Sequence, residues 1–554
     1  VNVRQSKGNG YLVDYFVIEP DYLIDISSLA ECFQSYTTSS TLFITNRLKE
    51  SVNSGPIRIG NVVNTFFDAL VYENSQNRVA VNDLLAKIFN ESPIELAACP
   101  DLQTEEDSRR FFEEVKKQFN HLAKVTRSKL NEPEYAVDLS KAYVEPSFLC
   151  PSFGVQGRFD FLMIDNIDNK TAKRKAVIIE LKSGKTPFGD TKGTAIGENH
   201  AAQIALYRLV TEQNLSIDYR NITNYILYSK IDDKNLRQIS FPLVRLQKLI
   251  AIRNKIVVEE HRLVNSEAKD LMKVHFGLIA DLIEELAMNP TTLVKNYILP
   301  SIISIYKQIN SFSELERAYF SRYYQFIARE SYLSKCSDFG GEISRSQSSL
   351  WLNAAEQKEE AGELLSDLEV ISEAGENDAA TICFAFKKKR PDEISNFREN
   401  DIILLYHQEE RDSSVVNQIV FKGIIKEISD SRIWVKLRYR QKREDLFKEG
   451  KLFTLERDFM DHSFTQMYRG LYAFLSHGDT EMKELFLGLK KPQFDETIKL
   501  VSEPDPGLRV IVEQAVRNSD YYLLEGPPGT GKTSRAMKAM IKEFSDSGKI
   551  ILLL

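Results

Sequence analysis

One stretch of the chain, GRFDFLMIDNIDNKTAKRKAVIIELKSGK at residues 157–185, most constrains what the protein can fold into. An alternating apolar run is followed by a polar segment and then by a second run rich in β-branched residues. This pattern predicts an antiparallel β-hairpin. If the loop is centred on Lys170, residues equally distant from it face each other, and Asp160 lies opposite Glu180.

Three charged side chains are expected on one face of this hairpin. The same register places Arg158 opposite Lys182. Because side chains alternate along a strand, Glu180 and Lys182 share a face, while Leu181 points into the core. Two opposed carboxylates need a neutralising partner, and hard oxygen ligands suit Mg²⁺ or Mn²⁺. The alternative is a solvated hairpin with a surface ion pair.

A helix predicted over residues 198–210 adds a polar stripe beside the hairpin. His200, Gln203 and Tyr207 are spaced three and four residues apart, so they lie on one helical face. The two segments together therefore present carboxylates, an ammonium group, an amide and a phenol to one region.

The combined pattern resembles the RecB-like branch of the PD-(D/E)XK nucleases. The residues that carry the resemblance are Gly157-x-x-Asp160, Glu180-x-Lys182 and Gln203-x-x-x-Tyr207. The resemblance implies a nuclease fold in which Asp160, Glu180, Lys182, Gln203 and Tyr207 are catalytic. It also implies that Asp160, Glu180 and the backbone carbonyl of Leu181 hold the metal ion.

A helix predicted over residues 58–70 bears on the same metal site. RecB-like nucleases carry Gly-x-x-x-His on such a helix, and this chain has Gly60-x-x-x-Asn64. An amide oxygen binds magnesium more weakly than imidazole or carboxylate does. Asn64 is therefore either a weak metal ligand or an ordinary polar helix residue. Asp68, one turn further on, and Glu145 are additional acidic candidates.

A second motif predicts a phosphate-binding loop. It consists of Gly526, Pro527, Pro528, Gly529, Thr530, Gly531, Lys532 and Thr533, between a strand predicted over residues 521–525 and a helix predicted over residues 534–544. Backbone N–H groups and the helix N-terminus would cradle the phosphates of ATP. Lys532 would reach the β- and γ-phosphates, and the hydroxyl of Thr533 would bind magnesium.

The amino-acid sequence of this loop resembles that of superfamily 1 helicases. In those proteins an upstream glutamine contacts the adenine, which makes Gln514 the candidate here. No later helicase motif follows the strand predicted over residues 549–554, and the chain does not start with Met. We therefore expect the front part of a longer protein, which alone binds nucleotide poorly and neither hydrolyses ATP at a useful rate nor unwinds DNA.

The chain as a whole is expected to be a multidomain α/β protein. The predicted domains are the nuclease (1–245), a helical connector and linker (246–375), a small β-barrel (376–445), a helical stalk (446–500) and the start of a P-loop, RecA-like helicase domain (501–554). Barrel strands are predicted at 380–387, 402–408, 415–428 and 433–439, and helices at 350–368 and 452–490. Two basic runs, 387–390 and 436–443, are either solvated loops or contacts to a nucleic-acid backbone.

Charge and cysteine content limit the location of the protein and its cofactors. The net charge of −7 excludes a uniformly basic coat, so any DNA must contact local basic surface. No apolar run approaches a membrane span and no signal peptide is evident, which favours a cytoplasmic protein, or a nuclear one in a eukaryote. The five cysteines are scattered, which favours reduced thiols.

The order of these parts resembles the flap-processing nuclease–helicases of DNA replication and repair. That resemblance implies cleavage of single-stranded or flapped DNA with Mg²⁺ or Mn²⁺, an ATP-driven motor that moves 5′ to 3′, and a single-strand-binding protein as a possible partner. Many members hold a four-cysteine iron–sulfur cluster. No cysteine lies between Cys150 and Cys336 here, so we expect no such cluster.

Two other functions remain open at this point. The nuclease fold could be catalytically weakened and could grip DNA only for the motor, as the substitution at Asn64 allows. The barrel, stalk and phosphate-binding loop also resemble those of RNA helicases, although the fused nuclease argues against that function.

Overall fold

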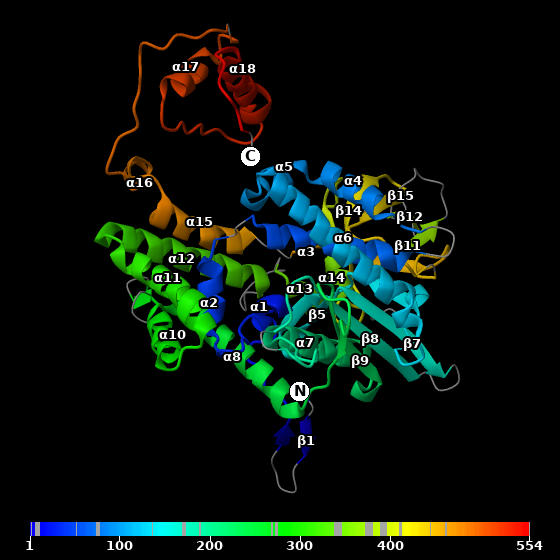
Figure 1. Ribbon diagram of the computed structural model, residues 1–554. Coiled ribbons are helices and arrows are strands. Elements are labelled where there is room, and N and C mark those ends of the chain that lie inside the picture. The colour runs from blue at the N-terminus through cyan, green and yellow to red at the C-terminus, as the bar shows by residue number, and fades with distance from the viewer. Residues whose placement is uncertain are drawn as a thin grey trace. The chain divides into compact units, whose positions relative to one another are not determined.

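The computed structural model describes the chain except for residues 2, 6–10, 51–52, 74–77, 136, 169–172, 188–189, 268–269, 272–274, 337–345, 372–379, 388–395, 409–412, 444, 460–462, 503 and 553–554. Most of the linker that its Ser- and Gly-rich composition predicts at 337–349, three residues of the first basic run and the centre of the hairpin loop thus lie outside the described residues. The chain divides into two compact units. The first comprises Val1–Asn310 and Ser321–Gly470, and the second comprises Ser311–Phe320 and Leu471–Leu554. Figure 1 shows their elements along the chain.

A five-stranded sheet with the order β10-β9-β8-β7-β4 organises the first half of the first unit. Its strands are β4 (Ala142–Val144), β7 (Phe161–Asp168), β8 (Lys173–Lys182), β9 (Ile222–Tyr228) and β10 (Leu236–Gln238). β8 and β9 are parallel, and the other neighbours are antiparallel. The parallel step is bridged by a helix, as parallel neighbours require.

The hairpin of β7 and β8 has the predicted register. Phe161 pairs with Ile179, and the same alignment continues toward the loop. One residue before Phe161, on the side away from the loop, Asp160 lies opposite Glu180. The predicted opposition of the two carboxylates is therefore confirmed.

The expected pairing of Arg158 with Lys182 is wrong. Arg158 ends a strand of a different, three-stranded sheet and pairs there with Ser147. That sheet consists of β3 (Ile24–Asp25), β6 (Val155–Arg158) and β5 (Ser147–Cys150). The chain changes sheets between Arg158 and β7, so Asp160 lies at the junction of the two sheets.

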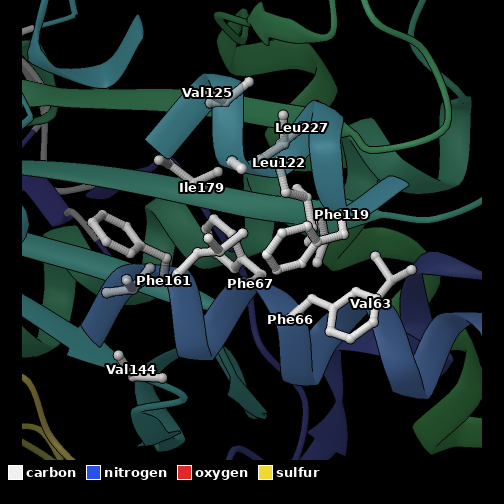
Figure 2. Close-up of a cluster of buried hydrophobic side chains, with 14 of the residues drawn as sticks. Val63, Phe66, Phe67, Phe119, Leu122, Val125, Val144, Phe161, Ile179 and Leu227 are labelled. Carbon is white, nitrogen blue, oxygen red and sulfur yellow. The ribbon is translucent and has the colours of Figure 1, made fainter. Parts of the chain in front are cut away.

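Two long helices cover one face of the five-stranded sheet (Figure 2). They are α3 (Gly55–Tyr72) and α6 (Glu105–Arg127). The rings of Phe66 and Phe119 pack edge to face with their centroids 5.3 Å apart. The centroids of the Phe67 and Phe161 rings lie 6.2 Å apart. Leu181 points into this core as predicted. Glu180 and Lys182, one residue to either side of it, consequently face the opposite side of the sheet.

Helix α6 begins where its sequence provides a cap. The Thr104 hydroxyl accepts a hydrogen bond from the backbone N–H of Asp107 at 3.1 Å. Acidic residues fill the first turn and Lys124 and Arg127 the last, which complements the helix dipole. His121 is buried, and its Nδ1 lies 2.8 Å from the carbonyl oxygen of Ser229, so it belongs to the core rather than to a DNA-binding face.

Helix α7 (Glu198–Leu215) lies against the other face of the sheet and is buried along most of its length. It connects β8 to β9 and carries the predicted polar stripe. The predicted helical connector is also present, with a π-helical turn, η7, within it. Its elements are α8 (Leu243–Asn265), α10 (Gly277–Met288), η7 (Val294–Ile298), α11 (Leu299–Ser311) and α12 (Glu314–Lys335).

Shorter elements complete the first unit. They include the α-helices α1 (Ile26–Ala30), α2 (Thr41–Leu48), α4 (Val81–Glu91), α5 (Pro93–Ala97), α13 (Ser349–Leu352) and α14 (Ala355–Glu360). The strands β1 (Val3–Gln5) and β2 (Tyr11–Val13) form a separate hairpin. No described helix is long and apolar enough to cross a membrane.

The predicted small barrel is present and closed, with the strand order β11-β12-β15-β14-β13-β16. Its strands are β11 (Leu364–Ile371), β12 (Thr381–Phe386), β13 (Ile402–His407), β14 (Phe421–Ile428), β15 (Arg432–Leu437) and β16 (Leu452–Arg457). The first and last of these were expected to be helical, and that expectation is wrong. The barrel therefore extends beyond residues 376–445 on both sides. Closure satisfies the strand edges that a four-stranded sheet would leave open.

The described part of the second unit consists of short helices joined by irregular segments. Its helices include α16 (Thr480–Phe486), α17 (Arg509–Arg517), η8 (Lys532–Met537, a π-helix) and α18 (Lys538–Asp546). α15 (Ser463–His477) begins in the first unit and ends in the second. The strand predicted at 521–525 and the described part of the one at 549–554 are not formed. Leu523 and Ile550 are exposed, and no described strand of this unit pairs with them.

Candidate functional site: an acidic cavity beside the central sheet

Asp160 and Glu180 meet at the junction between the two sheets of the first unit. The backbone N–H of Leu181 donates to Asp160 Oδ2 at 2.7 Å, which fixes the Asp160 carboxylate against β8. Burial raises the pKa of Asp160, although Lys182 and the Leu181 N–H act in the opposite direction. Burial and the neighbouring Asp160 raise the pKa of Glu180 to about 8. The two carboxylates therefore do not both ionise readily unless a further positive charge joins them.

A chain of hydrogen bonds links Glu180 to helix α7. Lys182 Nζ lies 2.8 Å from Glu180 Oε1 and donates to Gln203 Oε1, also at 2.8 Å. Gln203 Nε2 donates to the Tyr207 hydroxyl at 3.0 Å, and that hydroxyl donates to the Arg158 carbonyl at 2.6 Å. The structure therefore brings together all five side chains that the sequence proposes as catalytic.

The charge on Lys182 is held by this arrangement. Burial opposes the ammonium form, but Glu180 and Asp160 outweigh burial, so the pKa of Lys182 lies above its usual value. Lys182 is therefore a fixed positive charge in the free protein. Such a charge can position Glu180 and can stabilise negative charge on a phosphate.

The donor set fits a hard divalent cation. Glu180 is 3 % exposed, and its Oε2 atom has no hydrogen-bond partner among the described residues. Lys182 occupies the other oxygen, so Oε2 remains available beside Asp160. Among the described residues, no group of three His, Cys, Asp or Glu side chains could hold a metal ion. A cation here would need neutral oxygen donors as well, which are common in magnesium sites.

The structure places neutral candidates for that role at the same cavity. A cavity of about 890 Å³ is lined by Asp160, Glu180, Asn64 and Leu181, together with Lys182, Gln203 and Tyr207. Asn64 comes from α3, which passes close to β8, since a Cβ atom on Gly60 would meet the Ser183 hydroxyl at 3.3 Å. Asn64 thus faces the predicted site and does not lie on a distant helix surface.

Two further carboxylates surround the site but do not line the cavity. Burial, and after it Asp160, raises the pKa of Glu145 to about 9 and that of Asp68 well above its usual range. Arg158 forms an ion pair with Glu145 and compensates part of this charge. The sequence identified both acids as secondary candidates, and the structure places them beside Asp160.

Steric crowding explains why glycine occupies position 157 of this motif. A Cβ atom at this position would lie 3.0 Å from Ile26 Cδ1 and 3.1 Å from Tyr207 Cε1. Strand β6 therefore approaches α7 closely enough for the Tyr207 hydroxyl to reach the Arg158 carbonyl. A larger residue would move Tyr207 or the strand.

Two supporting residues were missed by the sequence analysis. Gln118 of α6 is fully buried and accepts a hydrogen bond from the Ser229 hydroxyl at 2.6 Å, behind the end of β8. Tyr228 lies 3.0 Å from His200 Nδ1, and burial lowers the pKa of His200 to about 3. His200 is therefore uncharged, and it supports the site through its contact with Tyr228. Neither contact is signalled by local spacing, because each joins segments far apart in the chain.

The end of the second basic run docks onto the part of the first unit that holds the five-stranded sheet, while Arg438 and Arg440 remain exposed. Gln441 accepts from the Val144 N–H at 3.1 Å and donates to the Val144 carbonyl at 2.8 Å. Lys442 donates to the Tyr72 carbonyl at 3.0 Å, near the end of α3. Tyr439 receives a hydrogen bond from Arg158 and lies under its guanidinium. Residues 439–443, here called the docking segment, therefore connect the barrel to the acidic cavity.

Two glycines of the predicted phosphate-binding loop have left-handed backbone conformations. Gly529 and Gly531 both have φ of 81°, in the left-handed region that glycine adopts without strain. Lys532 begins helix η8 and donates to the carbonyl of Pro527 at 2.9 Å, folding back over the loop. Gln514 on α17 receives a hydrogen bond from the Tyr522 hydroxyl at 3.3 Å. Thr533 is exposed at the start of the helix.

All five cysteines are buried free thiols. Burial raises the pKa of Cys32 and Cys150 to about 12. These thiols are therefore weak nucleophiles at neutral pH.

Comparison with known proteins agrees with the motifs. No protein-family model matches the chain. The DNA replication ATP-dependent helicase/nuclease DNA2 of Gallus gallus is 20% identical over 446 residues, covering 74% of this chain and 42% of the relative. Its Xenopus laevis counterpart is 22% identical over 449 residues, covering 74% of this chain and 39% of the relative. JHS1 of Arabidopsis thaliana, with the same description, is 22% identical over 256 residues, covering 44% of this chain and 18% of the relative.

The extent of these matches defines the relationship. The chain spans about two fifths of the length of the vertebrate relatives. The predicted resemblance is confirmed at the level of the family, and the chain is a relative of the DNA replication helicase/nucleases over about three quarters of its length.

Proposed function

We propose that the first unit is a divalent-metal-dependent nuclease that cleaves single-stranded or flapped DNA. The observation that carries the proposal is the buried hydrogen-bond chain from Glu180 through Lys182 and Gln203 to Tyr207. It holds one oxygen of Glu180 and leaves the other without a partner among the described residues, beside Asp160. An arrangement that constrains a carboxylate and leaves one oxygen free is suited to binding a cation.

Each residue has a definite role in this proposal. Asp160 and Glu180 hold the cation, with the Asn64 amide and the Leu181 carbonyl as neutral donors. Such an ion supplies Lewis-acid activation of water and of the phosphate when it is bound. Lys182 keeps Glu180 oriented and stabilises negative charge on the phosphate that is cleaved. Gln203 and Tyr207 keep Lys182 in place from α7.

The second unit is proposed to supply the first part of an ATP-driven motor. The glycines at 529 and 531 and the position of Lys532 at a helix start support a phosphate-binding role for the loop. Gln514 is the proposed adenine contact, and Thr533 the proposed magnesium ligand. The proposed direction, 5′ to 3′, rests on the family resemblance, and the printed names of the relatives support DNA as the substrate.

Cleavage of labelled strands tests the nuclease proposal. The full 554-residue chain is incubated with an end-labelled single-stranded DNA and an RNA of the same sequence, in Mg²⁺ or Mn²⁺ and in EDTA. The expected result is metal-dependent shortening of the DNA strand and much slower cleavage of the RNA. Cleavage that continues in EDTA, or that favours RNA, would overturn the proposal.

Asn64 supports a second candidate function, in which the fold binds DNA without cutting it. An amide in place of a stronger ligand would lower the affinity for the cation. Calorimetry distinguishes the two functions. No detectable binding of Mn²⁺ together with undiminished DNA affinity favours the binding module, whereas measurable Mn²⁺ binding that Asp160→Asn abolishes favours the nuclease.

A further inference from the structure

The cavity at Asp160 and Glu180 extends to a second wall of opposite character. This wall comes from helix α2, near the N-terminus, and from helix α15, which follows the barrel. Its charged and hydroxyl-bearing residues include Arg47, Tyr468 and Arg469. All three belong to the first unit, as does the acidic wall. Residues separated by about 420 positions in the chain thus line one cavity.

Three buried hydrogen-bond donors on this wall have no partner among the described residues. They are Arg47 Nη1, the Tyr468 hydroxyl and Arg469 Nε. The Arg47 side chain is 10 % exposed and Tyr468 is 2 % exposed. A buried donor without an acceptor destabilises the folded protein. Three such donors on one wall indicate that the wall is built for a ligand that supplies several acceptors.

The contacts around Arg47 fix its orientation. Another of its guanidinium nitrogens, Nη2, pairs with Glu260 at 2.9 Å, and its Cζ atom lies 4.3 Å from the centroid of the Tyr468 ring. The ion pair and the ring hold the group rigidly and leave Nη1 free. A pre-oriented guanidinium of this kind suits an oxyanion better than it suits an uncharged acceptor.

The charge of the surroundings favours an anion. Lys49 and Lys335 line the same part of the cavity, and burial lowers the pKa of each, as expected for cations with little solvent. The acids nearest to this wall are Glu260, which is paired with Arg47, and Asp25 and Glu31, whose charges oppose the effect of burial on Lys335 and Lys49. The wall therefore carries more positive than negative groups, unlike the wall formed by Asp160 and Glu180.

We propose that Arg47, Tyr468 and Arg469 form a phosphodiester-binding subsite that holds the nucleic-acid strand while another of its phosphates lies at Glu180. The inference rests on the proposed function, because it assumes that the ligand of the cavity is a strand with several phosphates. As a consequence, the proposed nuclease site contains residues from more than one of the predicted domains. Residues 1–245, the predicted nuclease domain, contain one member of the subsite, and α15 supplies the other two.

Binding without cleavage tests the subsite. The parent is the full chain carrying Asp160→Asn, in EDTA, and the probe is a fluorescent single-stranded oligodeoxynucleotide whose affinity is measured by anisotropy at several salt concentrations. Tyr468→Phe removes a hydroxyl that makes no hydrogen bond to a described residue, so the folded protein loses nothing. The dissociation constant is expected to rise roughly fivefold or more.

Arg469→Gln removes a charge, so its effect can also be measured through the salt dependence of DNA binding. The dissociation constant is expected to rise roughly tenfold, and the slope of log K against log salt to fall by about 0.7 for one lost phosphate contact. Tyr468→Phe should leave that slope unchanged. The matched control is Arg220→Gln, because Arg220 is exposed and paired only with Asp218 among the described residues. It should bind like the parent.

The outcomes separate the subsite from the function it rests on. If the parent binds DNA and both variants match it in affinity and salt slope while keeping its thermal midpoint, the subsite does not exist. If the parent binds no DNA in EDTA, the subsite is overturned, whereas the proposed nuclease function is decided separately by the cleavage assay in Mg²⁺ or Mn²⁺. Weaker binding in both variants, with a smaller slope for Arg469→Gln alone, establishes the subsite.

Discussion

At the scale of single residues, the site depends on Gln203 more than its chemistry suggests. Gln203 takes no part in binding a cation, but it joins Lys182 to Tyr207. Gln203→Leu removes both bonds and leaves the Lys182 ammonium held by Glu180 alone. We expect the single-turnover cleavage rate to fall roughly 10²-fold, because a small misplacement of a catalytic group has effects of that size. DNA affinity should stay constant.

Gln213→Leu is the control for this prediction, since Gln213 is an exposed residue of the same helix. It should cleave at the parent rate. If Gln203→Leu also cleaves at the parent rate, Lys182 does not need to be held from α7.

A buried histidine gives a pH-dependent prediction. Burial lowers the pKa of His275 to about 4, below its ordinary 6.5, with Glu260 and Arg47 acting in opposite directions on it. A lowered folded-state pKa means that the unfolded chain binds the proton more tightly. His275 therefore costs nothing above pH 6.5 and destabilises the fold as the pH falls toward 4.

Between pH 7 and pH 5 this linkage should lower the free energy of unfolding by about 2 kcal/mol. His275→Phe keeps a ring against Tyr324, whose ring centroid lies 5.7 Å away, and removes the titration. Denaturant titrations at both pH values should show a drop smaller by about that amount in the variant. Equal pH dependence in both proteins would contradict the assignment.

At the scale of elements, the docking segment is one of the contacts that join the barrel to the five-stranded sheet. Gln441 satisfies both backbone groups of Val144, which is 1 % exposed and lies on the edge strand β4. Gln441→Ala leaves these two groups without their partner. We expect the free energy of unfolding to fall by about 2 kcal/mol, measured by denaturant titration followed by circular dichroism.

Gln466→Ala serves as the control, because Gln466 is exposed on α15. It should unfold like the parent. A Gln441→Ala protein of unchanged stability would mean that water replaces the side chain at β4 without cost.

The docking segment also shows where sequence reasoning reaches its limit. Its basic residues were expected to be either solvated or bound to nucleic acid, and Gln441 and Lys442 instead contact backbone about 300 residues or more away in the chain. Likewise, the sequence predicts a helix where β16 forms. The periodicity of a short apolar run cannot distinguish a strand from a buried helix. Elements with long, regular patterns, such as α6 and α7, were located from the sequence.

The acidic cavity was more predictable than its surroundings, for a physical reason. The register of a hairpin and the spacing of a helix fix Asp160, Glu180, Gln203 and Tyr207 locally, and the structure confirms that they meet. The wall carrying Arg47 depends on how α15 packs after the barrel, and no local pattern encodes that packing.

At the scale of the whole molecule, an acidic protein can still bind a polyanion because its charge is unevenly placed. The net charge is −7, yet one wall of the cavity carries Arg47, Arg469 and two lysines. The negative wall at Asp160 and Glu180 then needs a cation before a phosphate can approach it. Metal and nucleic acid are therefore expected to bind cooperatively in this cavity.

The central claim is that Glu180 serves the chemistry of cleavage through its free oxygen. The most direct measurement is the single-turnover rate of single-stranded DNA cleavage in Mn²⁺ by the parent and by Glu180→Gln, at saturating protein. Glutamine keeps the shape and removes the charge, so the account predicts a rate at least roughly 10³-fold lower with unchanged DNA affinity. A Glu180→Gln protein that cleaves within about threefold of the parent rate would contradict it.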